Sequence, residues 1–160
     1  MSIKVGDTLP EATLMTLTKD GPAPVKVSEY FKGKKVALFA LPGAFTPTCS
    51  AKHLPGYIQH AGDLKQKGVD KIACLSVNDA FVMGAWGRSQ EAGDKVDMLA
   101  DGNAEFTRKI GLTMDGSRFG LGERSQRYSM LVVDGVVKSL NVEKPGAFEV
   151  SNAETMLKQA

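Results

Sequence analysis

Apolar and polar positions along this chain predict strands and helices in regular alternation. The run Lys35–Leu41 (KVALFAL) is almost continuously apolar and ends at Pro42-Gly43, as is typical of a central strand buried on both faces. Other short runs rich in β-branched and apolar residues lie between turn-forming residues. They predict further strands at Ala12–Leu17, Val25–Val27, Ile72–Val77, Val96–Ala100, Tyr128–Val133 and Val136–Val142.

Segments with helical periodicity separate most of these strands. The expected helices are Cys49–Lys67, kinked at Pro55, and then Asp79–Ala92, Asn103–Ile110 and Ser151–Lys158, the last with a capping-box pattern at its start. In the second helix, we expect the apolar side chains to face the sheet or a second subunit; these are Phe81, Val82, Met83 and Trp86. Gly21-Pro22 and Asp134-Gly135 are read as hairpin turns. This order predicts an α/β sandwich with a mixed sheet.

The composition is that of one ordinary globular domain, predicted over residues 1–160. The 160 residues are 42% apolar and 24% charged, and no repeat or polar linker interrupts them. The 20 basic and 18 acidic side chains are dispersed, which argues against a nucleic-acid or membrane partner. The N-terminus lacks the apolar stretch of a signal peptide or membrane helix, so we expect a soluble, cytoplasmic protein.

The candidate chemistry lies in the loop Pro42–Cys49 (PGAFTPTC), which follows the buried strand and brings Cys49 into the first turn of a helix. A helix N-terminus stabilises a thiolate, and ligands of open α/β folds bind beyond the carboxyl ends of the strands. Cys49 is therefore a candidate nucleophile. The alternative is an inert, buried cysteine near a helix start.

The neighbours of Cys49 allow two interpretations each. The Thr46 hydroxyl would either cap the helix or point at the sulfur, and Pro42 and Pro47 would either hold a rigid pocket or simply make turns. His53 follows Cys49 by about one helical turn, which could suggest a Cys-His pair or a metal site. We expect a packing or hydrogen-bonding role for it instead, because two ligands are too few for zinc and His60 lies far along the helix.

The motif PGAFTPTC resembles the active-site motif of the peroxiredoxins, in particular their atypical type II branch. The resemblance continues through His53–Tyr57 (HLPGY), Ser76–Met83 (SVNDAFVM) with Trp86, and Arg127–Met130 (RYSM), and it extends over essentially the whole chain. It implies a thioredoxin-like fold, with a central mixed sheet flanked by helices. The implied activity is a thiol-dependent peroxidase that reduces hydrogen peroxide and small organic hydroperoxides.

The resemblance also implies roles for particular residues. Cys49 would be the peroxidatic cysteine, and Pro42, Thr46 and Arg127 would complete the site. Arg127 and the Cys49 N–H could donate to the peroxide oxygens, while Thr46 could accept a hydrogen bond from the peroxide's own proton or donate to sulfur. Neither a metal nor an organic cofactor is required. Without the resemblance, Arg127 would be read as a surface arginine at a strand edge.

The second cysteine, Cys74, lies in an apolar strand, where a cysteine is usually a small filler. The resemblance instead makes it a candidate resolving thiol, because some relatives carry such a cysteine at this position. Both interpretations remain open at this point. In either case we expect no bond between Cys49 and Cys74 in the reduced, folded protein, and none without local unfolding.

The resemblance further implies glutathione with glutaredoxin, or thioredoxin, as reductant, and a homodimer packed through the active-site end. Two other classes of function are open to a thioredoxin-like scaffold. Thiol–disulfide exchange would call for Cys-x-x-Cys at the helix start, where Thr46 replaces the first cysteine. A noncatalytic binding module or holdase would not consume hydroperoxide with a thiol donor, and that assay distinguishes it.

Overall fold

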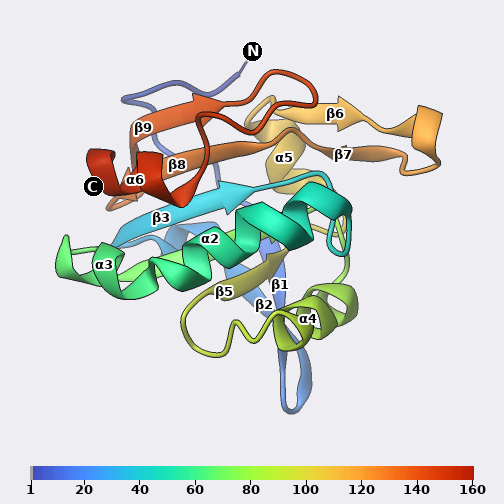
Figure 1. The fold of residues 1–160 in the computed structure, drawn as a ribbon, viewed down its shortest axis with the longest axis horizontal. Helices are drawn as coiled ribbons and strands as arrows, with labels where there is room; N and C mark the ends of the chain where they lie inside the picture. The colour runs from blue at the N-terminus through green and yellow to red at the C-terminus, as the bar shows by residue number, and fades with distance from the viewer. Residues whose placement is uncertain (1) are drawn as a thin grey trace.

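The computed structural model describes residues 2–160 and contains a mixed seven-stranded sheet with the strand order β2-β1-β5-β4-β3-β8-β9 (Figure 1). β3 is parallel to β4 and antiparallel to β8, which makes the sheet mixed, as predicted. The strands of this sheet are β1 (Thr13–Thr18), β2 (Gly21–Lys26), β3 (Lys35–Ala40), β4 (Lys71–Ser76), β5 (Asp97–Ala100), β8 (Tyr128–Val133) and β9 (Val136–Val142).

Helices cover both faces of the sheet and form two apolar cores. On one face, Phe39 and Cys74 pack with buried side chains of α2, α3, α4 and α6, and Figure 1 shows α2 and α3 lying in front of β3. On the other face, Leu38 and Leu75 pack with side chains from α1 and α5 or their ends. The helices are α1 (Val27–Tyr30), α2 (Leu54–Gln59), α3 (Ala61–Gln66), α4 (Ala80–Ser89), α5 (Glu105–Lys109) and α6 (Ala153–Gln159).

β3 is buried on both faces, as predicted for the apolar run Lys35–Leu41. Residues Val36–Ala40 of β3 have no exposed surface, because this strand lies between β4 and β8 with a helical layer on each side. The hairpin between β8 and β9 is also as predicted. Asp134 and Gly135 have φ values of 49° and 79°, the positive values that a two-residue type I′ turn requires. Within residues 2–160, no helix is long and apolar enough to cross a membrane.

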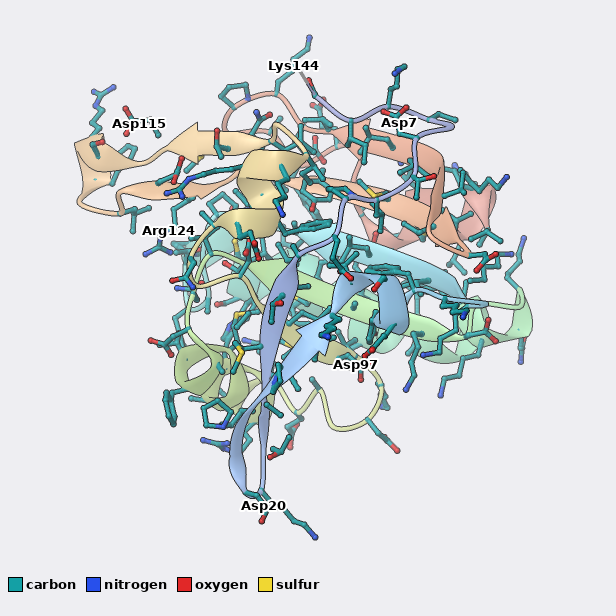
Figure 2. All side chains as sticks on the ribbon, turned by 180° about the vertical axis from the view of Figure 1, so that it is seen from behind. Asp7, Asp20, Asp97, Asp115, Arg124 and Lys144 are labelled. Carbon is teal, nitrogen blue, oxygen red and sulfur yellow. The ribbon has the colours of Figure 1, made fainter. Side chains whose placement is uncertain are left out.

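The N-terminal hairpin is present, but its predicted turn was wrong. The register runs from Thr13 opposite Lys26 to Thr18 opposite Gly21, so the turn falls at residues 19 and 20 and Gly21-Pro22 begins β2. Figure 2 shows Asp20 at the tip of this hairpin. Two prolines are tolerated in β2 because it is an edge strand, where a missing N–H leaves no ladder bond unmade.

The expected single helix from Cys49 to Lys67 was also wrong. Cys49–His53 form a turn of π-helix, η1, in which the Leu54 N–H donates to the Cys49 carbonyl. The chain then breaks at His60, between α2 and α3, and not at Pro55. Pro55 lies in the first turn of α2, where its missing N–H costs little. Such π-turns occur preferentially at functional sites.

A small hairpin in the glycine-rich loop was missed. β6 (Thr113–Asp115) pairs with β7 (Glu123–Ser125) around a short 3-10 turn, η2 (Ser117–Phe119), and this hairpin projects from the body of the molecule (Figure 1). Figure 2 shows Asp115 at its outer end. The strands are too short, and too rich in polar residues, to produce an alternating apolar pattern.

The predicted cap of α6 needs correction, and the apolar side chains of α4 divide between its two faces. The cap of α6 is Asn152, whose side chain accepts the Thr155 N–H at 2.8 Å, and not Ser151. On α4, Met83 and Trp86 face the core as expected, but Phe81 is 62% exposed. Phe81 lies in the first turn of the helix, on the side away from the sheet, and packing on one face leaves the other face to solvent.

Candidate active site

The loop after β3 places Cys49 at the start of a helix. The Ser50 N–H donates to the Thr46 carbonyl at 2.9 Å, which closes the first helical turn. The N–H of Cys49 comes one residue earlier, so it has no carbonyl partner within the helix. The Cys49 side chain is buried, with 1% of its surface exposed, and it packs in the core that contains Phe39.

Arg127 reaches the Cys49 sulfur from the sheet. Its Nη2 donates to Sγ at 3.0 Å. The antiparallel register of β3 and β8 pairs Ala40 with Tyr128, which brings the residue before β8 alongside the loop that leaves β3. Arg127 also stacks over the Phe148 ring, with 5.7 Å between the guanidinium carbon and the ring centroid. The surface arginine expected from spacing alone is therefore a partner of the cysteine thiol.

A second arginine, Arg124, holds the first residue of the loop. Its Nη1 donates to the Pro42 carbonyl at 3.1 Å, and its Nε donates to the Leu121 carbonyl at 3.0 Å. A Cβ on Gly43 would lie 2.6 Å from the same Nη1, so a larger residue there would displace the Arg124 guanidinium. Sequence reasoning missed Arg124, because nothing in its spacing separates it from an exposed strand arginine.

The Thr46 side chain is oriented by its own loop. Its Oγ1 donates to the Gly43 carbonyl at 2.6 Å. A hydroxyl has one proton, so this bond leaves the Thr46 oxygen as an acceptor. Of the roles considered for Thr46, accepting a hydrogen bond from a bound molecule fits this geometry, and donating to sulfur does not.

The neighbouring loops hold the backbone around Cys49. After β4, the Asn78 Oδ1 accepts the Ala44 N–H at 3.0 Å and the Ser76 hydroxyl at 2.7 Å. From α4, the Trp86 indole N–H donates to the Ser50 hydroxyl at 3.0 Å. Asn78 and Trp86 therefore hold the loop and the helix start on either side of Cys49 in place.

His53 is buried against Arg127. The Nη1 of Arg127 donates to His53 Nδ1 at 2.8 Å, and the hydrogen-bonding role expected for His53 is confirmed. Burial, followed by the nearby charge of Arg127, lowers the pKa of His53 to about 3. The ring therefore stays neutral at ordinary pH. No cluster of three or more His, Cys, Asp or Glu side chains that could hold a metal ion is found among residues 2–160.

Cys74 lies in the interior of β4, opposite Phe39 of β3 and Met98 of β5. It is completely buried and, like Cys49, has a free thiol. Burial is the largest cause that raises the pKa of the Cys74 thiol, and the charge of Cys49 acts in the same direction, against a smaller opposing effect of Arg127. The two cysteines belong to the same apolar core.

Arg127 lines a cavity of about 340 Å³, whereas Cys49 and Thr46 are not among its lining residues. One wall contains Pro42, Thr48 and Arg127, and the rest comes from β6, the start of β8 and the chain after β9. The lining residues are Pro42, Thr48, Thr113, Met114, Gln126, Arg127, Glu143, Lys144, Pro145, Gly146 and Ala147. Figure 2 shows Lys144 at the outer surface of this region.

A buried cysteine at a helix start, bonded to a guanidinium on a sandwich of this topology, has the features of a thiol-based oxidoreductase site. The Redoxin family model matches residues 4–157. Peroxiredoxin-2E of Arabidopsis thaliana is 55% identical over 161 residues, with 98% of this chain and 69% of that protein covered, and peroxiredoxin-2B of the same plant is 48% identical, with 98% and 97% covered.

Solved structures agree with these relatives. The crystal structure of reduced Prx3 from Vibrio vulnificus in complex with hydrogen peroxide is 62% identical, with a TM-score of 0.94 and 98% of both chains covered. The chain therefore belongs to the Redoxin family and is a peroxiredoxin. Its fold is thioredoxin-like, and it is a thiol-dependent peroxidase, an oxidoreductase.

Proposed function

We propose that Cys49 is the residue that reduces peroxide. The observation that carries this proposal is the 3.0 Å contact from Arg127 Nη2 to the Cys49 sulfur beside the cavity. A guanidinium and a helix N-terminus both stabilise a thiolate. The thiolate attacks one peroxide oxygen, an S–O bond forms as the O–O bond breaks, and the leaving oxygen takes a proton. The products are a Cys49 sulfenic acid and water, or an alcohol from an organic hydroperoxide.

Three other residues complete this proposed site. Arg127 donates to the peroxide oxygens as charge develops on the leaving group, which is the effect of a preorganised donor in a transition state. Thr46, whose own proton is donated to the Gly43 carbonyl, accepts a hydrogen bond from the peroxide O–H. Pro42 forms part of the cavity wall, and its carbonyl is held by Arg124. No metal or organic cofactor takes part in this scheme.

The substrates we propose are hydrogen peroxide and small organic hydroperoxides. Support for the first is that a structural relative is described in complex with hydrogen peroxide. Support for the second is the cavity of about 340 Å³, since pockets of about 300–1,000 Å³ commonly bind small molecules. Met114, Pro145 and Ala147 provide apolar surface beside Arg127, where the carbon substituent of a hydroperoxide would lie.

We propose that an external thiol recycles the sulfenic acid, supplied by glutathione with glutaredoxin or by thioredoxin. The thiol attacks the sulfenic sulfur, a mixed disulfide forms and water leaves; a second thiol then releases Cys49. Cys74 is the alternative resolving residue, but its burial and raised pKa make it a poor nucleophile in the folded protein. Resolution by Cys74 would need local unfolding around Cys49.

We further propose that residues 1–160 form one domain that assembles as a homodimer in the cytoplasm. Support for the dimer is that Phe45 and Phe81 are 55% and 62% exposed near the active-site end, where apolar side chains would be covered by a second copy. Sedimentation at several concentrations tests assembly. Cell fractionation tests the location against a plastid, the compartment named for Arabidopsis peroxiredoxin-2E.

Steady-state peroxidase assays with each reductant supplied separately test the function. We expect wild type and Cys74→Ser to turn over and Cys49→Ser to be inactive. Mass spectrometry after one equivalent of peroxide, without added thiol, tests recycling. A persistent gain of one oxygen supports the external thiol. A loss of two hydrogens that disappears in Cys74→Ser supports resolution by Cys74.

A further inference from the structure

His53 is bonded through both ring nitrogens to groups outside its own helix. Nδ1 lies 2.8 Å from Arg127 Nη1, and Nε2 lies 3.0 Å from the Ser151 carbonyl oxygen. The ring has no exposed surface and is enclosed by three aromatic rings. The centroids of those rings lie 4.9 Å (Phe39), 5.8 Å (Tyr57) and 5.0 Å (Phe148) from the centroid of His53.

These two contacts determine where the His53 proton lies. A guanidinium has only donors, so Nδ1 must accept from Arg127. A carbonyl only accepts, so Nε2 must carry the hydrogen that it donates to Ser151. The neutral Nε2–H tautomer satisfies both contacts, and the lowered pKa of His53 agrees with this state.

The Ser151 carbonyl is itself held in place. The Tyr57 hydroxyl donates to it at 3.0 Å. The Glu143 carboxylate fixes the chain before it by accepting the N–H groups of Glu149, Val150 and Ser151 at 2.8–2.9 Å and the Ser151 hydroxyl at 2.7 Å. Burial opposes ionisation of Glu143, but these hydrogen bonds together lower its pKa.

The groups form a continuous chain from the segment before α6 to the reacting sulfur. Glu143 orders the backbone at Ser151, Ser151 holds His53, His53 holds Arg127, and Arg127 donates to Cys49. We propose that His53 is a positioning residue, which fixes the Arg127 guanidinium so that Nη2 stays on the sulfur and its other donors face the peroxide. This proposal rests on the proposed roles of Cys49 and Arg127 and adds the residue that orients the arginine.

The physical reason is the freedom of the arginine side chain. Arg127 has several rotatable bonds, and the contact to sulfur together with stacking on Phe148 still leaves the guanidinium free to turn within its own plane. A second contact on Nη1 removes that freedom before substrate binds, which is how preorganised sites lower the barrier. A misplacement of about 1 Å can cost on the order of 100-fold in rate.

The test uses His53→Phe, which keeps an aromatic ring among its three neighbours and removes both hydrogen bonds. The rate of Cys49 oxidation by hydrogen peroxide can be followed by stopped-flow fluorescence of Trp86, the one tryptophan, which is bonded to Ser50. We expect a loss of roughly 10- to 100-fold in the second-order rate constant. His53→Asn places an amide oxygen near the position of Nδ1 and should recover part of that loss.

A double-mutant cycle separates positioning from general damage. If His53 acts through Arg127, then His53→Phe should change the rate less than about twofold in an Arg127→Met background, although it costs 10- to 100-fold in the parent. Equal losses in both backgrounds, or no loss in the parent, would overturn the proposal. If Arg127→Met alone keeps the parent rate, the proposed role of Arg127 fails instead, and the two failures are distinguishable.

Two controls keep the outcome clear. His60→Phe changes the other histidine, which is partly exposed and lies near Asp63, and it should leave the rate unchanged. Near-ultraviolet circular dichroism and the unfolding midpoint report whether His53→Phe folds. If it does not fold, the cycle is repeated with His53→Asn and His53→Gln. We then expect Asn to retain more activity than Gln, whose amide lies nearer the position of Nε2; the reverse order would count against the proposal.

Discussion

The two cysteines of this peroxiredoxin share one apolar core but lie in different electrostatic surroundings. Cys49 sits at a helix start, with its sulfur 3.0 Å from Nη2 of Arg127, and Arg127 in turn lines a cavity. Cys74 sits in the middle of β4, between Phe39 and Met98, where burial raises its pKa. Both side chains are almost fully buried, so exposure does not separate them. What differs is the presence of donors and of space for a substrate.

Replacing each cysteine in turn should give the largest difference in peroxidase rate between the two positions. Cys49→Ser should lose the peroxidase rate by at least ~10³-fold, because removal of the proposed nucleophile leaves no covalent route. Cys74→Ser should change the rate less than about threefold with an external thiol supplied in excess. Peroxide consumption measured with both variants checks this. A similar loss in the two variants would mean that Cys74 is needed in the catalytic cycle.

Arg127→Lys tests whether the donors around Cys49 matter beyond their charge. Lysine keeps the positive charge but lacks the planar fork with which Arg127 donates to Sγ and to His53 at the same time. We expect the second-order rate with hydrogen peroxide to fall by roughly 10- to 1,000-fold, comparable to the loss of one preorganised donor. Unchanged rates would place Arg127 outside the reaction.

The neutral histidine beside Cys49 should leave a signature in the pH dependence of stability. The pKa of His53 is about 3 when folded and about 6.5 when unfolded, so only the unfolded chain takes up a proton between these values. Stability is therefore lost as the pH falls through this window, by up to about 1.4 kcal/mol per pH unit. The charges of Arg127 and Glu143 act on the pKa of His53 in opposite directions, and Glu143, whose own pKa is lowered in the folded protein, adds a further loss of stability at lower pH.

Urea unfolding of wild type and His53→Phe between pH 6.5 and pH 5 checks this sign. The unfolding free energy of wild type minus that of His53→Phe should fall as the pH falls. His60 is the same in both proteins, so its contribution to the difference cancels. A constant difference over the window would show that the folded protein takes up the His53 proton as readily as the unfolded chain does, and would remove the basis for the Nδ1 acceptor.

The smallest effect should come from Cys74→Ala. Removing one buried sulfur leaves a small cavity between Phe39 and Met98, for which we expect a loss of roughly 1 kcal/mol in unfolding free energy. Cys74→Ser should cost more, because it buries a hydroxyl among apolar neighbours. Urea unfolding of both variants measures these values. A stabilising Cys74→Ser would argue against the filler role.

Much of the fold could be predicted from periodicity, and the errors fall where local pattern is weakest. β3, β4, β8 and β9 were found within about a residue, because long apolar runs have few alternatives. The hairpin β6–β7 and the π-turn at Cys49–His53 were not found. The first has no apolar alternation, and the second depends on bonds between a carbonyl and an N–H five residues on, which residue types do not indicate.

The candidate site also contains residues that local sequence predicts and residues that it does not. The helix-start position of Cys49 follows from the order of strand, proline-rich loop and helix, so it could be read from the sequence alone. Arg127 could be named only through the family resemblance, because it lies far from Cys49 along the chain and meets it through the pairing of β8 with β3. Arg124 and Glu143 gave no signal of any kind.

The sequence by itself therefore determined the class of fold, the candidate nucleophile and the loop that presents it, since these depend on contacts between near neighbours. Only the tertiary structure decided how His53 and Arg127 are bonded to each other and to Cys49, and which carbonyl holds the histidine. The physical reason is that hydrogen bonds between residues distant in the chain depend on strand register and helix packing. Those distances follow from the whole core, and no local pattern encodes them.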